Sequence, residues 1–233
     1  MIKAVDDGVG KIISSLNELK IKENTIIIFY SDNGGYGPAT SMHPLKGYKG
    51  TYYEGGIRVP FFVNWPNVVA SDTHCSTPIT GVDIYPTICE MIIGQNYENH
   101  KGDGVSIVPL LKGNKIKDRA LYWHFPAYLQ SYQRADEQPD PLFRARPCSV
   151  IRKGRWKLIE YFENNNVELF DLNEDIGEKN NLSKRRPEIA KSLKTHLDIW
   201  RKKTAAAVPM KKNPDYDDEA ERRAIIEFGR TNN

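Results

Sequence analysis

The sequence has little of what marks several common protein classes. Its three cysteines are scattered among 233 residues, so they provide neither a disulfide framework nor zinc-ligand spacing. The net charge is only +3, and no basic stripe with interleaved aromatic residues occurs, which argues against a nucleic-acid-binding protein. No apolar run approaches the roughly 20 residues of a membrane span. What remains is a globular enzyme or binding module, with enough chain for a substantial core in one or two domains.

A helix and an apolar strand open the chain and lead to polar residues. The run from Thr25 to Tyr30 is β-branched and aromatic throughout, which predicts a central strand buried on both faces. Open α/β sheets place their ligands at the carboxyl ends of such strands. The sequence therefore predicts a ligand site directly after Tyr30. The preceding helix has one apolar stripe: Ile2, Val5, Val9, Ile12, Ile13, Leu16 and Leu19.

Two short segments after this strand carry the candidate chemistry. Asp32 and Asn33 stand side by side in Ser-Asp-Asn-Gly-Gly, and their oxygens are hard ligands suited to Ca²⁺ or Mg²⁺. Lys46 and Lys49 follow in a glycine-punctuated loop, and their ammonium groups suit an oxyanion. Asp, Asn and Gly are also common turn formers, so the first segment alone is more typical of a plain loop. Together the segments indicate half of a metal-assisted site for a phosphate or sulfate ester.

These segments also carry a family resemblance. Residues 31–35 read SDNGG and residues 49–60 read KGTYYEGGIRVP, an ordered pair that closely resembles the second signature region of the type I sulfatases. These are the formylglycine-dependent, arylsulfatase-like hydrolases of the alkaline phosphatase superfamily. Further similarity in segments 78–87, 151–159 and 168–175 extends the resemblance over about residues 1 to 200. It implies an α/β fold class: the C-terminal part of an alkaline-phosphatase-like α/β/α sandwich, followed by a small antiparallel sheet with a C-terminal helix.

The resemblance implies roles for individual residues. Asp32 and Asn33 match the family's metal pair, for Ca²⁺ or Mg²⁺, and Lys49 matches its catalytic, sulfate-binding lysine. A lysine there would stabilise oxygens that gain charge in the transition state. Lys46 is expected to contact substrate. The implied substrate is a sulfate ester, and a sulfated glycan is preferred because the aromatic segment 122–132 could contact sugars.

Two histidines leave alternatives open. His43 precedes the lysine loop, where it is either a donor or proton relay to the bound ester or a surface histidine. His124 follows Trp123 within an aromatic stretch. Such a grouping suits either packing or a sugar-binding rim, in which rings stack on pyranose faces.

The chain also departs from the family pattern. The nucleophile motif Cys/Ser-x-Pro-Ser-Arg is absent, and Cys75, Cys89 and Cys148 all lack that context. We therefore expect no nucleophile in this chain, formylglycine in a missing N-terminal sulfatase half, and no activity from the chain alone. The family suggests a periplasmic or secreted location, which the sequence itself leaves unknown. Two alternatives remain: a phosphomonoesterase or phosphodiesterase of the same superfamily, and a non-catalytic pseudoenzyme or binding module.

The expected organisation has four parts. Residues 1–125 would complete the large α/β domain, and residues 126–148, which contain several prolines, would form a long exposed loop. Residues 149–208 would form a small α+β subdomain of strands and one helix. Residues 209–233 would be a charged tail.

Overall fold

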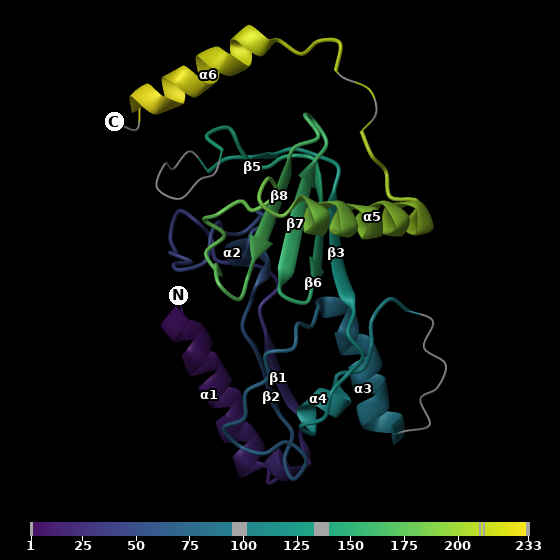
Figure 1. The fold of residues 1–233 in the computed structure, drawn as a ribbon. Helices are drawn as coiled ribbons and strands as arrows, with labels where there is room; N and C mark the ends of the chain where they lie inside the picture. The colour runs from purple at the N-terminus through teal and green to yellow at the C-terminus, as the bar shows by residue number, and fades with distance from the viewer. Residues whose placement is uncertain (1, 95–101, 133–139, 210, 212, 232–233) are drawn as a thin grey trace. The chain divides into compact units, whose positions relative to one another are not determined.

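A computed structural model describes residues 2–94, 102–132, 140–209, 211 and 213–231 (Figure 1). The chain divides into two compact units. The first unit comprises residues 1–30 and 60–117, and the second comprises residues 31–59 and 118–233. Residues 31–59, which we expected to belong with residues 1–125, thus group with the C-terminal sheet.

The first unit contains helices around one pair of strands. In chain order its elements are α1 (Ile2–Glu18), η1 (Lys22–Asn24), β1 (Ile27–Tyr30), β2 (Phe61–Asn64), η2 (Gly81–Asp83), α3 (Ile84–Ile93) and α4 (Val108–Leu111). β1 and β2 are antiparallel, with Ile28 opposite Val63. A small apolar cavity is lined by residues of both strands, α3 and the start of α4, which marks the interior of this unit.

A buried aspartate organises η2, the turn that leads into α3. The Asp83 carboxylate accepts hydrogen bonds from the backbone N–H of Thr80 at 2.8 Å and of Val105 at 2.9 Å. Thr80 and Asp83 form a capping box, which satisfies N–H groups that the first helical turn leaves without partners.

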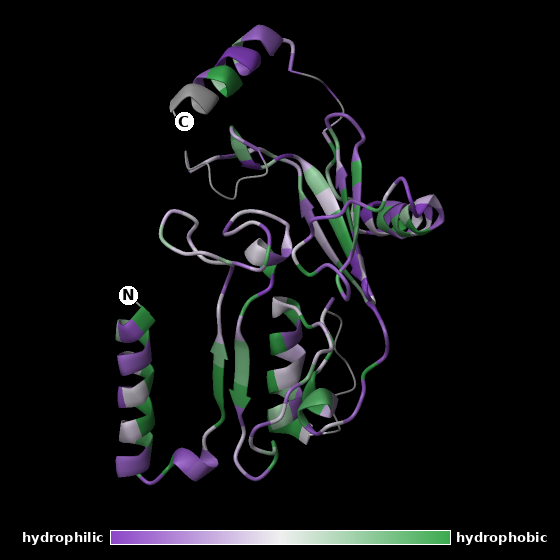
Figure 2. Cartoon of the chain, turned by 60° about the vertical axis from the view of Figure 1, so that its left-hand side comes forward, coloured by the Kyte–Doolittle hydropathy of each residue, from purple (hydrophilic) through white to green (hydrophobic). Residues whose placement is uncertain are grey.

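The prediction that the strand ending at Tyr30 is buried on both faces is wrong for this structure. Phe29 in β1 is 39% exposed and Phe62 in β2 is 64% exposed. The physical reason is that β1 pairs with β2 alone among the described strands. Figure 2 shows both strands as apolar, and α1 as apolar along one side. Several residues of the predicted α1 stripe are likewise exposed, namely Ile2, Val5, Ile12 and Leu19.

The second unit is built on a four-stranded antiparallel sheet. Its strands are β3 (Ala120–Phe125), β6 (Cys148–Lys153), β7 (Trp156–Tyr161) and β8 (Val167–Asp171), in the order β3-β6-β7-β8. Positive φ values at Gly154 and Asn165 allow the tight turns that join the last three strands. The expected small antiparallel sheet is therefore confirmed.

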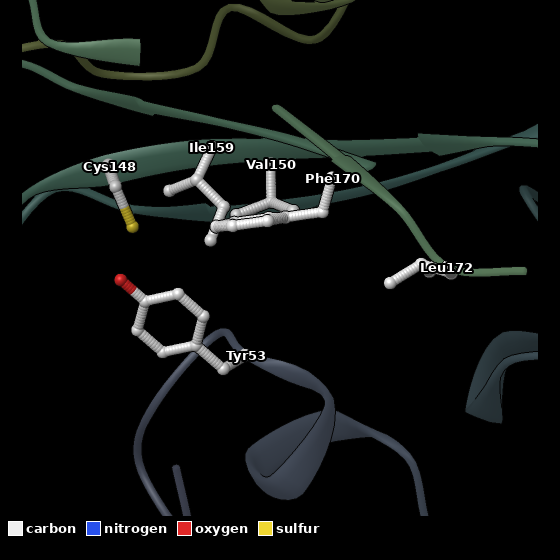
Figure 3. Close-up of a cluster of buried hydrophobic side chains, with 6 residues drawn as sticks. All are labelled: Tyr53, Cys148, Val150, Ile159, Phe170 and Leu172. Atoms are coloured by element: carbon white, nitrogen blue, oxygen red, sulfur yellow. The ribbon is translucent and has the colours of Figure 1, made fainter. Parts of the chain in front are cut away.

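Both faces of this sheet are covered. On one face α5 (Pro187–Thr204) packs Leu193 and Leu197 against apolar residues of β6, β7 and β8. On the other face Tyr53, next to α2 (Glu54–Ile57), packs into a cluster with Cys148, Val150, Ile159, Phe170 and Leu172 (Figure 3). Because strand residues alternate between faces, β6 and β7 contribute to both clusters. The expected C-terminal helix is confirmed as α5.

The segment expected to be a long loop contains paired strands. β4 (Leu129–Gln130) and β5 (Phe143–Ala145) form a short antiparallel pair, extended by a hydrogen bond from Ser131 N–H to the Leu142 carbonyl. Residues 133–139 of that segment lie outside the described residues. The charged tail contains α6 (Asp218–Thr231). Within the described part of the chain, no helix has the length and apolar content to cross a membrane.

Candidate functional site

The two candidate segments are tied together by their backbones. We call them the site loops: residues 31–37 and 46–56. Gly34 N–H donates to the Gly56 carbonyl at 2.9 Å, and Lys49 N–H donates to the Gly35 carbonyl at 2.9 Å. A Cβ on Gly34 would lie 1.9 Å from the Gly55 carbonyl oxygen, so only glycine allows this approach. The fold of the second unit thus brings Asp32, Asn33 and Lys49 into one group of loops.

Asp32 and Asn33 have side-chain oxygens that no described residue uses. Asp32 is exposed and Asn33 is half-buried, and a hydrogen bond runs from Ser31 Oγ to the Asn33 backbone carbonyl at 3.0 Å. One carboxylate and one amide fit a hard cation such as Ca²⁺, which takes six to eight oxygens. Among the described residues no group of three or more His, Cys, Asp or Glu side chains could hold a metal. These two residues therefore suit part of a coordination sphere.

The two lysines of the second site loop differ in their surroundings. Lys49 is exposed, and its ammonium has no ion pair with any residue that the structure describes. The Lys46 ammonium instead lies 3.9 Å from the centroid of the Tyr53 ring and donates to the Glu178 carbonyl at 3.4 Å. A cation held against an aromatic face is partly satisfied already. Lys49 is thus the better placed of the two for an external oxyanion.

A buried ionic cluster lies behind the second site loop. The Lys157 ammonium is 3.1 Å from Glu54 Oε1 and 2.8 Å from Glu178 Oε1, and all three side chains are at most 1% exposed. The Glu178 carboxylate also accepts the backbone N–H of Glu54 at 2.5 Å. Burial raises the pKa of Glu178, and the Lys157 charge opposes that rise. The cluster joins the loop that carries Lys49 to β7 and to the segment after β8.

Sequence reasoning missed Lys157 and Glu178. The available signal was a lysine within the apolar stretch of β7, where Trp156 and Leu158 flank it. A lysine inside a buried strand requires a partner, because an unpaired buried charge is very costly. The partners lie 103 and 21 residues away in the chain, so spacing alone could not identify them.

The structure separates Trp123 and His124. Consecutive strand residues point to opposite faces, and Trp123 packs against the Tyr53 cluster while His124 lies beside Trp200 of α5. His124 Nδ1 is 2.7 Å from Ser149 Oγ, and its Nε2 is 2.7 Å from the Ala207 carbonyl. These contacts favour packing, the alternative left open for His124. A role of either residue in binding substrate stays a prediction.

The remaining candidates differ in accessibility. His43 is exposed, and its backbone N–H donates to Ser41 Oγ at 3.2 Å, which leaves its proposed relay role a prediction. Among the thiols, Cys148 is buried, and this burial raises its pKa to about 12. A thiol with such a pKa is almost entirely protonated near neutral pH and is a poor nucleophile. Figure 3 shows Cys148 within the apolar cluster around Tyr53.

Comparison with known proteins gives consistent matches. The family model for the C-terminal region of N-sulphoglucosamine sulphohydrolase matches residues 48–203, and the sulfatase family model matches residues 1–94. A sulfatase of Formosa agariphila is 33% identical over 224 residues, covering 85% of this chain and 38% of the relative. The chain therefore spans about two fifths of that relative's length.

Solved structures agree with these matches. The crystal structure of Ps i-CgsB in complex with k-i-k-neocarrahexaose has a TM-score of 0.71 and 27% identity, and it covers 98% of this chain and 46% of that one. A further structure, of a protein in complex with its substrate D-glucosamine-2-N,6-O-disulfate, has a TM-score of 0.69 and 22% identity over 91% of this chain and 41% of that one. The second likeness concerns the fold alone.

Proposed function

Because the chain belongs to the sulfatase family, we propose that it supplies the C-terminal part of a sulfuric ester hydrolase and carries half of that enzyme's metal and sulfate site. The observation that carries the proposal is the pairing of the two site loops. Their backbone hydrogen bonds hold Asp32, Asn33 and Lys49 in one group, and the functional atoms of these side chains have no partner among the described residues.

Each of these residues has a specific role in the proposal. Asp32 and Asn33 would hold Ca²⁺ or Mg²⁺ through hard oxygens. A divalent cation bound there would polarise the ester by drawing charge onto its oxygens. The Lys49 ammonium would contact a sulfate oxygen and stabilise the charge that develops on it. Lys46, held against Tyr53, would chiefly support the loop.

We propose a sulfated carbohydrate as substrate. Ps i-CgsB, whose likeness covers 98% of this chain, was solved in complex with k-i-k-neocarrahexaose. Tyrosine rings beside the second site loop could contact a sugar.

The chain alone would not hydrolyse a sulfate ester. Two protein ligands leave most of a Ca²⁺ coordination sphere to water. The buried Cys148 is protonated, and none of the three cysteines has the sequence context for formylglycine. We propose that the formylglycine nucleophile and the remaining metal ligands come from an N-terminal sulfatase half, which the partial coverage of the relatives is consistent with.

Reconstitution tests the proposal. The chain would be mixed with the N-terminal part of the Formosa agariphila sulfatase, carrying formylglycine, and assayed with Ca²⁺ on an aryl sulfate and an aryl phosphate. We expect sulfate hydrolysis that neither part shows alone, that Asp32→Ala abolishes and that Lys49→Ala slows. Lys184→Ala, at an exposed position far along the chain, should leave the rate unchanged. Preference for the phosphate, or turnover by the chain alone, would contradict the proposal.

A further inference from the structure

Arg144 in β5 is a cation without an acidic partner among the residues that the structure describes. Its guanidinium lies over the ring of Tyr132, with Cζ 3.9 Å from the ring centroid. Nε and Nη1 are buried and make no hydrogen bond with the described residues, whereas Nη2 is not one of the buried atoms without a partner. Burial lowers the pKa of Arg144. Donors left unsatisfied in this way are costly to a fold unless something else uses the charge.

Three other arginines in the strands and turns of the second unit are paired with carboxylates, in contrast to Arg144. Arg146, two residues further on, engages three carboxylates, those of Asp140, Glu163 and Glu221. Arg152 lies 3.6 Å from Glu54, and Arg155 pairs with Asp171 and Glu174. The pattern indicates that this unit provides counter-charges for its structural arginines. Arg144 is therefore a candidate for binding an anion from outside the chain.

Arg144 lies directly against the second site loop. A Cβ built on Gly50 would be 3.0 Å from Arg144 Cδ and 3.0 Å from its Nε, so the arginine side chain packs on the backbone of Gly50. Gly50 adopts φ +91, a conformation that glycine permits, and it follows Lys49 directly. Two cations without carboxylate partners among the described residues therefore flank one glycine.

Aromatic rings complete this surface. Tyr36 of the first site loop is 51% exposed and meets Tyr132 edge to face, with ring centroids 4.9 Å apart. Tyr48 lies on Tyr132 at 5.6 Å, and its buried hydroxyl has no hydrogen-bond partner among the described residues. An exposed ring next to a guanidinium suits a sugar that carries a negative charge, because the ring can stack on the pyranose while the cation binds its anion.

We propose that Arg144, Tyr132 and Tyr36 form a subsite for a second oxyanion, sulfate or carboxylate, on the saccharide whose sulfate ester binds at Lys49. An oxyanion at Nη2 would give the guanidinium the counter-charge that this chain does not provide. The planar fork of arginine matches both anions, so the two share one recognition chemistry. The inference deepens the proposed function and rests on it for the position of the first sulfate.

Direct binding tests the subsite without requiring turnover. The purified chain would be immobilised and probed by surface plasmon resonance in the presence of Ca²⁺, with two matched pairs of sugars. D-Glucosamine-2-N,6-O-disulfate is compared with N-acetyl-D-glucosamine-6-O-sulfate, and glucuronate 2-sulfate with glucose 2-sulfate. The first pair tests a second sulfate and the second pair tests a carboxylate. We expect the dianionic member of at least one pair to bind about tenfold more tightly, as a charge-assisted contact provides.

Substitutions then assign the preference to Arg144. Arg144→Met should abolish the preference and leave the affinity for the monoanionic sugar unchanged. Arg185→Met removes an equal charge at an exposed position and should keep the preference. Arg144→Lys keeps the charge but loses the planar fork, so it should retain part of the preference for the dianionic sugar. If circular dichroism shows that Arg144→Met does not fold, the Arg144→Lys variant is used for the test instead.

The outcomes for the two proposals are separable. Absence of saturable binding, absence of any preference in the unsubstituted chain, or an unchanged preference in both Arg144 variants would overturn the subsite. Lys49→Ala should weaken both members of a pair equally. If Lys49→Ala has no effect while Arg144→Met abolishes the preference, the subsite stands and the proposed sulfate site at Lys49 is wrong.

Discussion

Replacing Lys157 by methionine is the sharpest test of how the site loops are held. The change removes the ammonium and keeps a side chain of similar length, so it leaves the Glu54 and Glu178 carboxylates facing each other in a buried site. The remaining cations nearby are Arg152, 3.6 Å from Glu54, the half-exposed Arg58, 3.7 Å from Glu54, and Lys46, which donates to the Glu178 backbone carbonyl at 3.4 Å. Among the described residues, none of these three forms an ion pair with the Glu178 carboxylate.

The expected cost follows from this geometry. Breaking a fully buried ion pair by removing one partner costs about 3–5 kcal/mol, because the other charge is left without compensation. We therefore expect Lys157→Met to lower the free energy of unfolding of the second unit by about that amount near pH 7. Lys153→Met, at an exposed site on the neighbouring strand, should stay within about 0.5 kcal/mol of the parent.

The loss of unfolding free energy caused by Lys157→Met should increase with pH. Burial already raises the pKa of Glu178, and losing Lys157 removes the charge that opposes this rise. A carboxyl whose folded pKa exceeds its unfolded value of about 4.3 loses its stabilising contribution as pH increases through the folded pKa. The difference between variant and parent should therefore be small at acid pH and should increase above about pH 4.3. Adding Glu178→Gln to the variant should recover part of the loss near pH 7.

Urea unfolding followed by tryptophan fluorescence measures these differences. In a Trp65→Phe background the remaining tryptophans, Trp123, Trp156 and Trp200, all lie in the second unit. The reasoning is refuted if Lys157→Met lowers the free energy of unfolding by less than about 1 kcal/mol at pH 7, or by an amount that does not change with pH. Either result would mean that the Glu54 and Glu178 carboxylates are in contact with water.

Four further predictions concern the loops and the first unit. In the reconstituted enzyme, Lys49→Ala should lower kcat with a barrier increase of about 2.7–4 kcal/mol, and a change in KM alone would contradict a transition-state role. Asp32→Ala should weaken Ca²⁺ binding to the chain in calorimetry, and unchanged affinity would place the metal elsewhere. Gly34→Ala should destabilise the second unit by about 1–3 kcal/mol and speed hydrogen exchange at the Gly34 and Lys49 amides, whereas Gly8→Ala, with nothing within 4 Å of its Cβ, should not. The chain should self-associate with increasing concentration in sedimentation velocity, and Phe62→Ser should reduce this, whereas a monomer at every concentration would contradict it.

The sequence predicted the architecture of the C-terminal region. The small antiparallel sheet and the C-terminal helix, which the family resemblance implied, are both present. The burial of β1 was predicted wrongly because periodicity reports the preference of a segment, not whether a neighbour covers it. The pairing of β4 with β5 was missed because prolines and charges dominate that segment.

The site was also predictable only in part, because sequence pattern does not report which residues the fold brings together and buries. Asp32, Asn33 and Lys49 lie in glycine-rich segments whose order carries the family resemblance, so their grouping could be expected. Lys157, Glu178 and Arg144 come from strands and connections far along the chain, and each looks like an ordinary surface charge in the sequence. Their special character depends on tertiary burial, which only the fold determines.

The two units differ in how completely they bury their apolar residues, and this difference bears on how the chain works. In the second unit both sheet faces are covered, one by α5 and one by the cluster around Tyr53, and the site loops belong to this covered unit. In the first unit the apolar side chains of α1, β1, β2 and α3 remain exposed in large number. Exposed apolar surface of this kind marks a place where another part of a protein packs. The groups proposed to bind sulfate therefore sit on a unit that can hold its own geometry.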